Sequence, residues 1–365
     1  MVTSEKKERV GEIEFWRMIF CAVIFIYHVS LDSTSEHTLF ARGQIGVELF
    51  FILSGLFMAK SADMLRSKNP AGTKALGRES MKYVIKKYIS FFPYHVFAFV
   101  CGFAIRIYIH GWNGEQILSN AVLSIPQFFL IHMGGLTNSH KIVSVEWYIS
   151  SMLIAMLLIY PLLRKFYDEY VHIAAPLLSL SIMGWALAER GTLLGMYEWC
   201  GITTWGVLRA ILAMNLGCIV YELAKYLKGK NWSVLQQIFL TLAGLSGYVL
   251  TLIYADFTLN RKIYFVCLFL LMGSVAVSFS GVNLYGKYMN GSFFRHLGKL
   301  SLPFYLNTNI IRFILKQFDV NTLHYSYFIV IAFVLNLILS EVLLLIVDRG
   351  IRRRRQNKCK TEYVT

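Results

Sequence analysis

Two reactive side chains lie in the first long apolar segment of the chain, EFWRMIFCAVIFIYHVS. Arg17 and His28 are eleven residues apart. This is close to three full helical turns and places both on one face, about 16 Å apart along the axis. Ionisable groups in so apolar a helix are costly unless they face a cavity or a partner, so both are functional candidates. The alternative is that Arg17 extends to the surface and His28 bonds to a neighbouring helix.

The second apolar segment, GQIGVELFFILSGLF, carries Glu48 near its start. We expect Glu48 to lie at a depth in the membrane similar to that of His28. The short connection 31–42 makes the two segments neighbours. A carboxylate beside a histidine selects its tautomer and raises its basicity, as in a general base directed at a hydroxyl. We therefore expect His28 to be a general base oriented by Glu48, with a structural His–Glu pair as the alternative. We interpret Ser54 and Gly55 as small residues at a helix-packing surface rather than as a nucleophile.

Further polar residues are expected near the same end of other apolar segments. The fourth segment opens with VEWYIS, and three arginines map to the outer halves of their segments. Together these groups indicate a polar cavity that opens outward and continues inward past Arg17. The candidates for substrate binding are Glu146, Trp147, Tyr148, Arg209 and Arg312.

The composition shows which elements must hold these side chains. The 365 residues are 56% hydrophobic, 15% aromatic and only 16% charged, with a mean hydropathy of +0.53. A soluble domain has roughly a quarter charged residues, so the sequence predicts an all-α polytopic membrane protein. Ten runs are long enough to cross a bilayer: 13–30, 43–60, 91–109, 145–163, 173–188, 203–223, 234–254, 262–281, 297–315 and 326–347.

The positions of lysine and arginine predict the orientation of these spans. With the N-terminus in the cytoplasm, 26 of the 36 basic residues lie in inner segments and six in outer ones, as the positive-inside rule requires. We therefore expect both termini inside, a cytoplasmic N-terminus (1–12), a membrane domain (13–347) and a basic cytoplasmic tail (348–365). The same distribution accounts for the net charge of +15 without a nucleic-acid partner.

Two segments between the spans have distinct expected roles. The stretch GRESMKYVIKKYISFFPY places Lys82, Lys86 and Lys87 near Tyr83 and Ile85, which favours a basic amphipathic helix on the inner leaflet. The semi-apolar stretch 117–133 is interrupted by proline, and we expect it to be re-entrant or interfacial. The nine histidines and six cysteines show no metal-ligand spacing, so no metal site is predicted.

Several of these segments resemble the acyltransferase-3 family of integral membrane O-acyltransferases. EFWRMIFCAVIFIYH resembles the family's Arg-(ten residues)-His signature, and GQIGVELFFILSGLFMAKS is similar to its G-V-D/E-L-F-F segment. KYISFFPY, SVEWYISSMLIAMLLIYPLL and LGKLSLPFYLNTNII resemble its later segments, in order, so the resemblance runs from about residue 12 to 350. Two positions depart from the pattern: Ser90 replaces a second basic residue, and Thr308 replaces the usual late histidine.

The resemblance implies ten spans in the plasma membrane, an acyl-CoA donor from the cytoplasm and an acceptor hydroxyl on an extracytoplasmic or lipid-linked glycan. The donor, with acetyl-CoA as the commonest case, is a co-substrate, and no bound cofactor is implied. We expect Arg17, Lys86 and Lys87 to bind the donor, and His28 with Glu48 to activate the acceptor. A donor such as Tyr148 or an outer arginine would stabilise the oxyanion.

Two other functions remain open at this point. Ten spans with buried charges also suit a glycan or anion transporter, although the chain shows no internal repeat, which many transporters have. A non-catalytic membrane scaffold would tolerate changes at both His28 and Glu48. Membrane lipid is the other expected partner, and a homo-oligomer is left open by the sequence.

Overall fold

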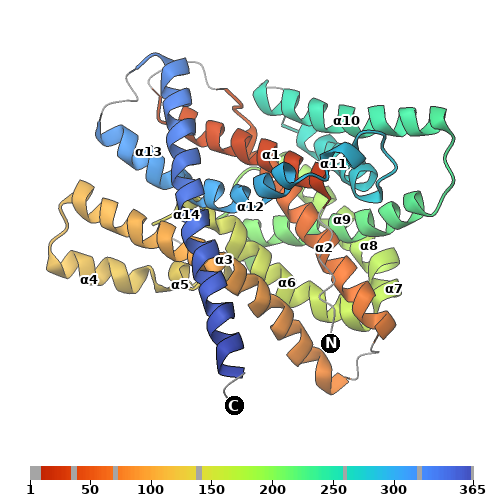
Figure 1. The fold of residues 1–365 in the computed structure, drawn as a ribbon, viewed down its shortest axis with the longest axis horizontal. Helices are drawn as coiled ribbons and strands as arrows, with labels where there is room; N and C mark the ends of the chain where they lie inside the picture. Colours follow the sequence, from red (N-terminus) through yellow and green to blue (C-terminus); the bar gives the residue numbers. More distant parts are fainter. Residues whose placement is uncertain are drawn as a thin grey trace.

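The computed structural model describes residues 10–33, 39–68, 73–136, 142–257, 261–318 and 323–362. Most of the expected N-terminal segment 1–12 and the end of the basic tail therefore lie outside the described residues. Figure 1 shows a bundle built almost entirely of helices. The larger helices are α1 (Gly11–Ser30), α2 (Gly46–Lys68), α3 (Thr73–His110), α6 (Trp147–Lys165), α8 (Ala175–Trp185), α9 (Trp205–Lys228), α10 (Val234–Asp256), α11 (Ile263–Ser280), α12 (Ser292–Leu306), α13 (Thr308–Gln317) and α14 (Tyr325–Glu362).

Shorter elements complete the chain. They are helices α4 (Gly114–Leu123), α5 (Ile125–Phe128) and α7 (Tyr167–Glu169). Single turns of 3₁₀ helix are η1 (Gly43–Ile45), η2 (His132–Gly134), η3 (Ser144–Glu146) and η6 (Gly286–Met289), and η4 (Tyr170–Ala174) and η5 (Ala186–Arg190) are π-helical. Strands β1 (Trp199–Cys200) and β2 (Thr203–Thr204) pair antiparallel, with Trp199 opposite Thr204.

Nine helices in the described part of the chain are long and apolar enough to cross a membrane. They are Gly11–Ser30, Gly43–Ser67, Ala75–His110, Ser144–Lys165, Tyr167–Arg190, Trp205–Lys228, Val234–Asp256, Ile263–Ser280 and Tyr325–Ile351. They coincide with nine of the ten runs expected from the sequence and confirm the all-α membrane fold. The orientation of the termini stays a prediction.

The remaining expected run, 297–315, is wrong as a continuous span, because the helix is interrupted between α12 and α13 at Asn307. The carbonyl of Phe304 accepts a hydrogen bond from the side-chain amide of Asn336 on α14, at 2.9 Å. The side-chain amide of Asn307 donates to Ser340 Oγ on the same helix, at 3.2 Å. Interrupted helices are tolerated in a membrane when neighbouring side chains satisfy the freed backbone groups, and α14 does this here.

The basic stretch from Lys82 to Lys87 is helical, and its place at the inner leaflet stays a prediction. It belongs to α3, which runs without a break for 38 residues into the third span. At 1.5 Å per residue, α3 is about 57 Å long and exceeds the roughly 30 Å hydrocarbon core. Helix α14 is also 38 residues long, and the start of α3 and the end of α14 protrude on the same side in Figure 1.

Close packing of α2 against α9 explains the small residues in the second span. A Cβ added to Gly55 would lie 2.0 Å from the carbonyl oxygen of Met214, and one added to Gly217 would lie 2.1 Å from that of Ile52. Only glycine permits this approach, which is how membrane helices pack through small residues. The contact places the N-terminal ends of α2 and α9 side by side and so determines the partner of Glu48.

Candidate active site

Helix α1 carries Arg17 in contact with α12. Arg17 Nη1 lies 2.6 Å from Glu14 Oε2, and its Nη2 donates to Ser301 Oγ at 3.3 Å. Arg17 therefore joins α1 to α12, and its charge also reaches Tyr148 of α6. Its side chain nevertheless keeps 26% of its surface exposed. An arginine held in this way can still bind an anionic or strongly polar ligand.

The imidazole of His28 lies near the other end of α1. The residue is half-buried, and its ring packs beside that of Tyr27, with centroids 5.0 Å apart. Arg312 of α13 is close enough to act on it electrostatically, and two bonds of 2.6 and 2.9 Å join Arg312 to Asp32, four residues beyond His28. No side chain in the described segments forms a hydrogen bond with His28.

The expected pairing of His28 with Glu48 is wrong. Arg209 of α9 donates to Glu48 Oε1 through Nε at 3.0 Å and Nη2 at 2.5 Å. Both side chains are only 1% exposed. The third arm of the guanidinium, Nη1, donates to the Gly195 carbonyl at 2.8 Å, and its planar group lies 4.8 Å from the ring centroid of Trp147. This geometry is that of a structural ion pair that joins α2, α6 and α9.

Glu146 also belongs to a buried hydrogen-bond network. Its partner is His95, which is not among the site residues predicted from the sequence. His95 Nδ1 lies 2.6 Å from Glu146 Oε1, with both side chains fully buried. His95 Nε2 lies 2.8 Å from the carbonyl of Phe128, and Gln127 Nε2 donates to Glu146 Oε2 at 3.0 Å. His95 could have been found from the sequence, because it is an ionisable residue inside an apolar run.

The hydrogen-bond partners of His95 restrict which atoms of His95 and Glu146 carry a proton. The Phe128 carbonyl only accepts, so His95 Nε2 must carry a proton. His95 and Glu146 then share a second proton as an imidazolium–carboxylate pair or as a neutral imidazole and acid. Either arrangement ties the segment containing Gln127 and Phe128, which includes α4 and α5, to α3 and α6.

Tyr148 is the half-buried member of the fourth segment. Its hydroxyl lies 3.5 Å from Met152 Sδ, and its ring lies 5.9 Å from that of Tyr305 on α12. Tyr305 in turn donates to the carbonyl of Val145 at 2.7 Å. Tyr148 therefore packs beside Tyr305 of α12 and lies within electrostatic reach of Arg17.

The late family segment, LGKLSLPFYLNTNII, contacts the residues before α6 through Asn309 rather than through a histidine. Asn309 Nδ2 donates to Ser144 Oγ at 3.0 Å. Thr308, at the position of the family's late histidine, is buried and bonds within its own helix to the carbonyl of Phe304, at 3.4 Å. A late histidine therefore has no counterpart at this place in the structure.

The two lysines expected to bind the donor are neighbours in α3 but lie on different faces of it. Lys86 is exposed and lines a surface hollow with Met81 and Ile85, whereas Lys87 is half-buried. The contacts of Arg17 do not include Lys86. In the described part of the chain, no group of three metal-binding side chains is positioned to hold an ion.

An apolar helical bundle with ionisable groups held inside it defines a polytopic membrane protein with an internal polar site. The family model of the acyltransferase domain, acyltransferase family 3, matches residues 10–345, nearly the whole chain. The chain therefore belongs to this family of membrane acyltransferases. Comparison with curated proteins gave no match, and neither did comparison with solved structures.

The Glu48–Arg209 pair makes a first prediction about stability. Removing one partner of a buried ion pair typically costs about 3–5 kcal/mol, because the other charge is left uncompensated. We expect Glu48→Gln and Arg209→Met each to lower the thermal stability of the detergent-solubilised protein strongly, and the double variant to lose less than the sum. Independent, additive losses in this double-mutant cycle would show that the two side chains do not interact.

The His95–Glu146 network makes a second prediction. In Glu146→Gln, the amide NH₂ donates to Nδ1 of a neutral His95 and the amide oxygen accepts from Gln127, so every polar group stays satisfied. Glu146→Leu leaves His95 and Gln127 unpaired, at a cost of about 1–3 kcal/mol for each buried group. Thermal unfolding should therefore resemble wild type for Gln and fall for Leu; equal losses in both variants would refute the network.

Proposed function

We propose that the protein transfers an acyl group, acetyl in the commonest case, from cytoplasmic acyl-CoA to a hydroxyl of an extracytoplasmic or lipid-linked glycan across the plasma membrane. The observation that supports this most is on α1: Arg17 keeps 26% of its side-chain surface exposed although it pairs with Glu14, and His28 is half-buried with no hydrogen-bonding side chain among the described residues, whereas Glu48 and Arg209 are fully buried in an ion pair. The family match supports acyl transfer in general.

In the proposed mechanism, the donor extends along α1. Arg17 binds the phosphates or the polar pantetheine groups of acyl-CoA. The pantetheine arm passes Tyr148, which lies within electrostatic reach of Arg17. The thioester carbonyl then reaches His28, with the pantetheine arm spanning the distance between the two residues.

The chemical step needs a base and a positive charge near the carbonyl. His28 accepts the proton from the acceptor hydroxyl as the hydroxyl oxygen attacks the thioester carbon. The charge of Arg312, held by Asp32, stabilises the oxyanion. The C–S bond breaks, the ester is formed, and the CoA thiolate leaves and takes up the proton from His28. Glu48 has no part in this step, since Arg209 occupies it.

His28→Ala is expected to abolish transfer while the protein folds normally. General-base catalysis contributes about 10²–10⁴-fold, so release of free CoA from acetyl-CoA in the presence of source-membrane glycans should fall by at least two orders of magnitude. Ester content of the surface glycan, measured by mass spectrometry, should fall with it. His172→Ala is the matched control, because His172 is exposed and bonds only to the nearby Asp168 carbonyl. CoA release by His28→Ala at the wild-type rate would refute the mechanism. If the wild-type protein itself releases no CoA, the protein is a transporter rather than an acyltransferase.

Arg17→Ala should act mainly on the donor. Loss of an arginine that binds ground state and transition state alike raises KM without lowering kcat, so the KM for acetyl-CoA should rise about tenfold or more and kcat should change less. Arg17→Lys should recover part of the loss, because lysine keeps the charge but not the planar fork. An unchanged KM for acetyl-CoA would exclude Arg17 from donor binding.

A further inference from the structure

The first half of α3 has two different faces. One face packs on α6, where Arg164 Nε donates to Glu79 at 3.0 Å and the rings of Tyr83 and Tyr160 stack with centroids 4.2 Å apart. Val84 on this face is buried. These contacts hold the helix against the bundle and orient its other face outward.

The outward face has an apolar stripe beside a row of cations. Met81, Ile85 and Ile89 are 50%, 46% and 62% exposed, at intervals of four residues that align them along the helix. Arg78, Lys82 and Lys86 follow the same interval one step around the helix, and all three are exposed. These six residues line an open hollow of about 670 Å³, which we call the α3 face.

The α3 face combines an apolar stripe with a row of cations, so it suits an amphiphilic ligand with an anionic head group. Apolar surface left in water is unfavourable, so the stripe requires an apolar cover. The three cations beside it attract negative charge at an anionic membrane. The exposed side of the helix continues through Pro93 to Val100 in the membrane-crossing part, so a ligand there is continuous with the lipid around the protein.

We propose that the α3 face binds an anionic phospholipid of the adjoining leaflet. Its acyl chains lie along Met81, Ile85 and Ile89, and its phosphate is bound by Arg78, Lys82 and Lys86. This site is separate from the acyl-transfer site and does not depend on the proposed function.

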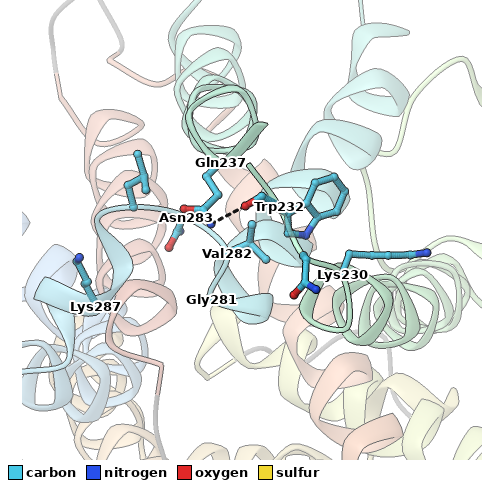
Figure 2. A pocket seen from close by; sticks show the side chains of 9 residues that line it. Lys230, Trp232, Gln237, Gly281, Val282, Asn283 and Lys287 are labelled. Atoms are coloured by element: carbon cyan, nitrogen blue, oxygen red, sulfur yellow. Dashed lines mark hydrogen bonds between the residues drawn. The ribbon is translucent and has the colours of Figure 1, made fainter. Parts of the chain in front are cut away.

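A second surface hollow provides a control. It measures about 390 Å³ and is lined by the connection between α9 and α10 and that between α11 and η6. Figure 2 shows Asn283 and Gln237 at its centre, with Lys230 and Lys287 extending to opposite sides. It carries exposed lysines without an apolar stripe. Reversing lysine charges at this hollow therefore changes the net charge as much as reversing those of the α3 face, but leaves the α3 face intact.

The experiment uses the full chain in nanodiscs of equal parts phosphatidylcholine and phosphatidylglycerol, followed by native mass spectrometry of the lipids retained in detergent. The wild type should retain phosphatidylglycerol preferentially. In R78E/K82E/K86E this preference should fall about tenfold or more. The control K228E/K230E/K287E, which combines the two lysines of the second hollow with the exposed Lys228 two residues before Lys230, should keep it. M81S/I85S/I89S should retain less of both lipids.

Three results would overturn the proposal. The first is an unchanged preference in R78E/K82E/K86E, and the second is an equal loss in the matched control, which would show a general charge effect. The third is a wild-type dimer that M81S/I85S/I89S converts to a monomer, which would make a second copy the occupant. If charge reversal prevents folding, R78Q/K82Q/K86Q should show the same loss of preference.

Discussion

A charge within a helical membrane bundle needs a partner, and this requirement organises the centre of the molecule. Arg209 holds Glu48, Glu146 shares a proton with His95, and Asp32 holds Arg312. The pairs join helices distant in sequence: α2 with α9, and α3 with α6. Pairing of this kind builds the scaffold and also leaves His28, among the described side chains, without a hydrogen-bonding partner. A histidine left unpaired in this way is available for a substrate.

Helix α1 links this scaffold to function because it runs parallel to the late segment. Arg17 contacts Ser301, Phe25 packs against Phe304 with ring centroids 5.1 Å apart, and Asp32 binds Arg312. The bend after Leu306 turns α13 so that Arg312 reaches the end of α1. The family's early and late segments therefore meet along one line, although about 280 residues separate them.

Local features could be predicted from the sequence, but the choice of partners could not. Nine spans follow from apolar length, and the Gly55 packing surface follows from residue size. The bend at Asn307 depends on Asn336 of α14, and the true partner of Glu48 lies 161 residues away. A single sequence shows that a buried carboxylate needs a cation but not which one. It favours His28 as the partner of Glu48 because His28 is nearer in the sequence than Arg209, and this prediction is wrong. His95 was predictable and was overlooked.

The central claim is that the donor lies along α1 with its carbonyl at His28. A structure with an acetyl-CoA analogue, in which a methylene replaces the thioester sulfur, tests it most directly. We predict the phosphates or polar pantetheine groups at Arg17, the arm beside Tyr148, and the carbonyl within about 3.5 Å of the position from which His28 would deprotonate an acceptor. An analogue bound elsewhere, with the His28 ring covered only by lipid or aliphatic side chains, would contradict the account.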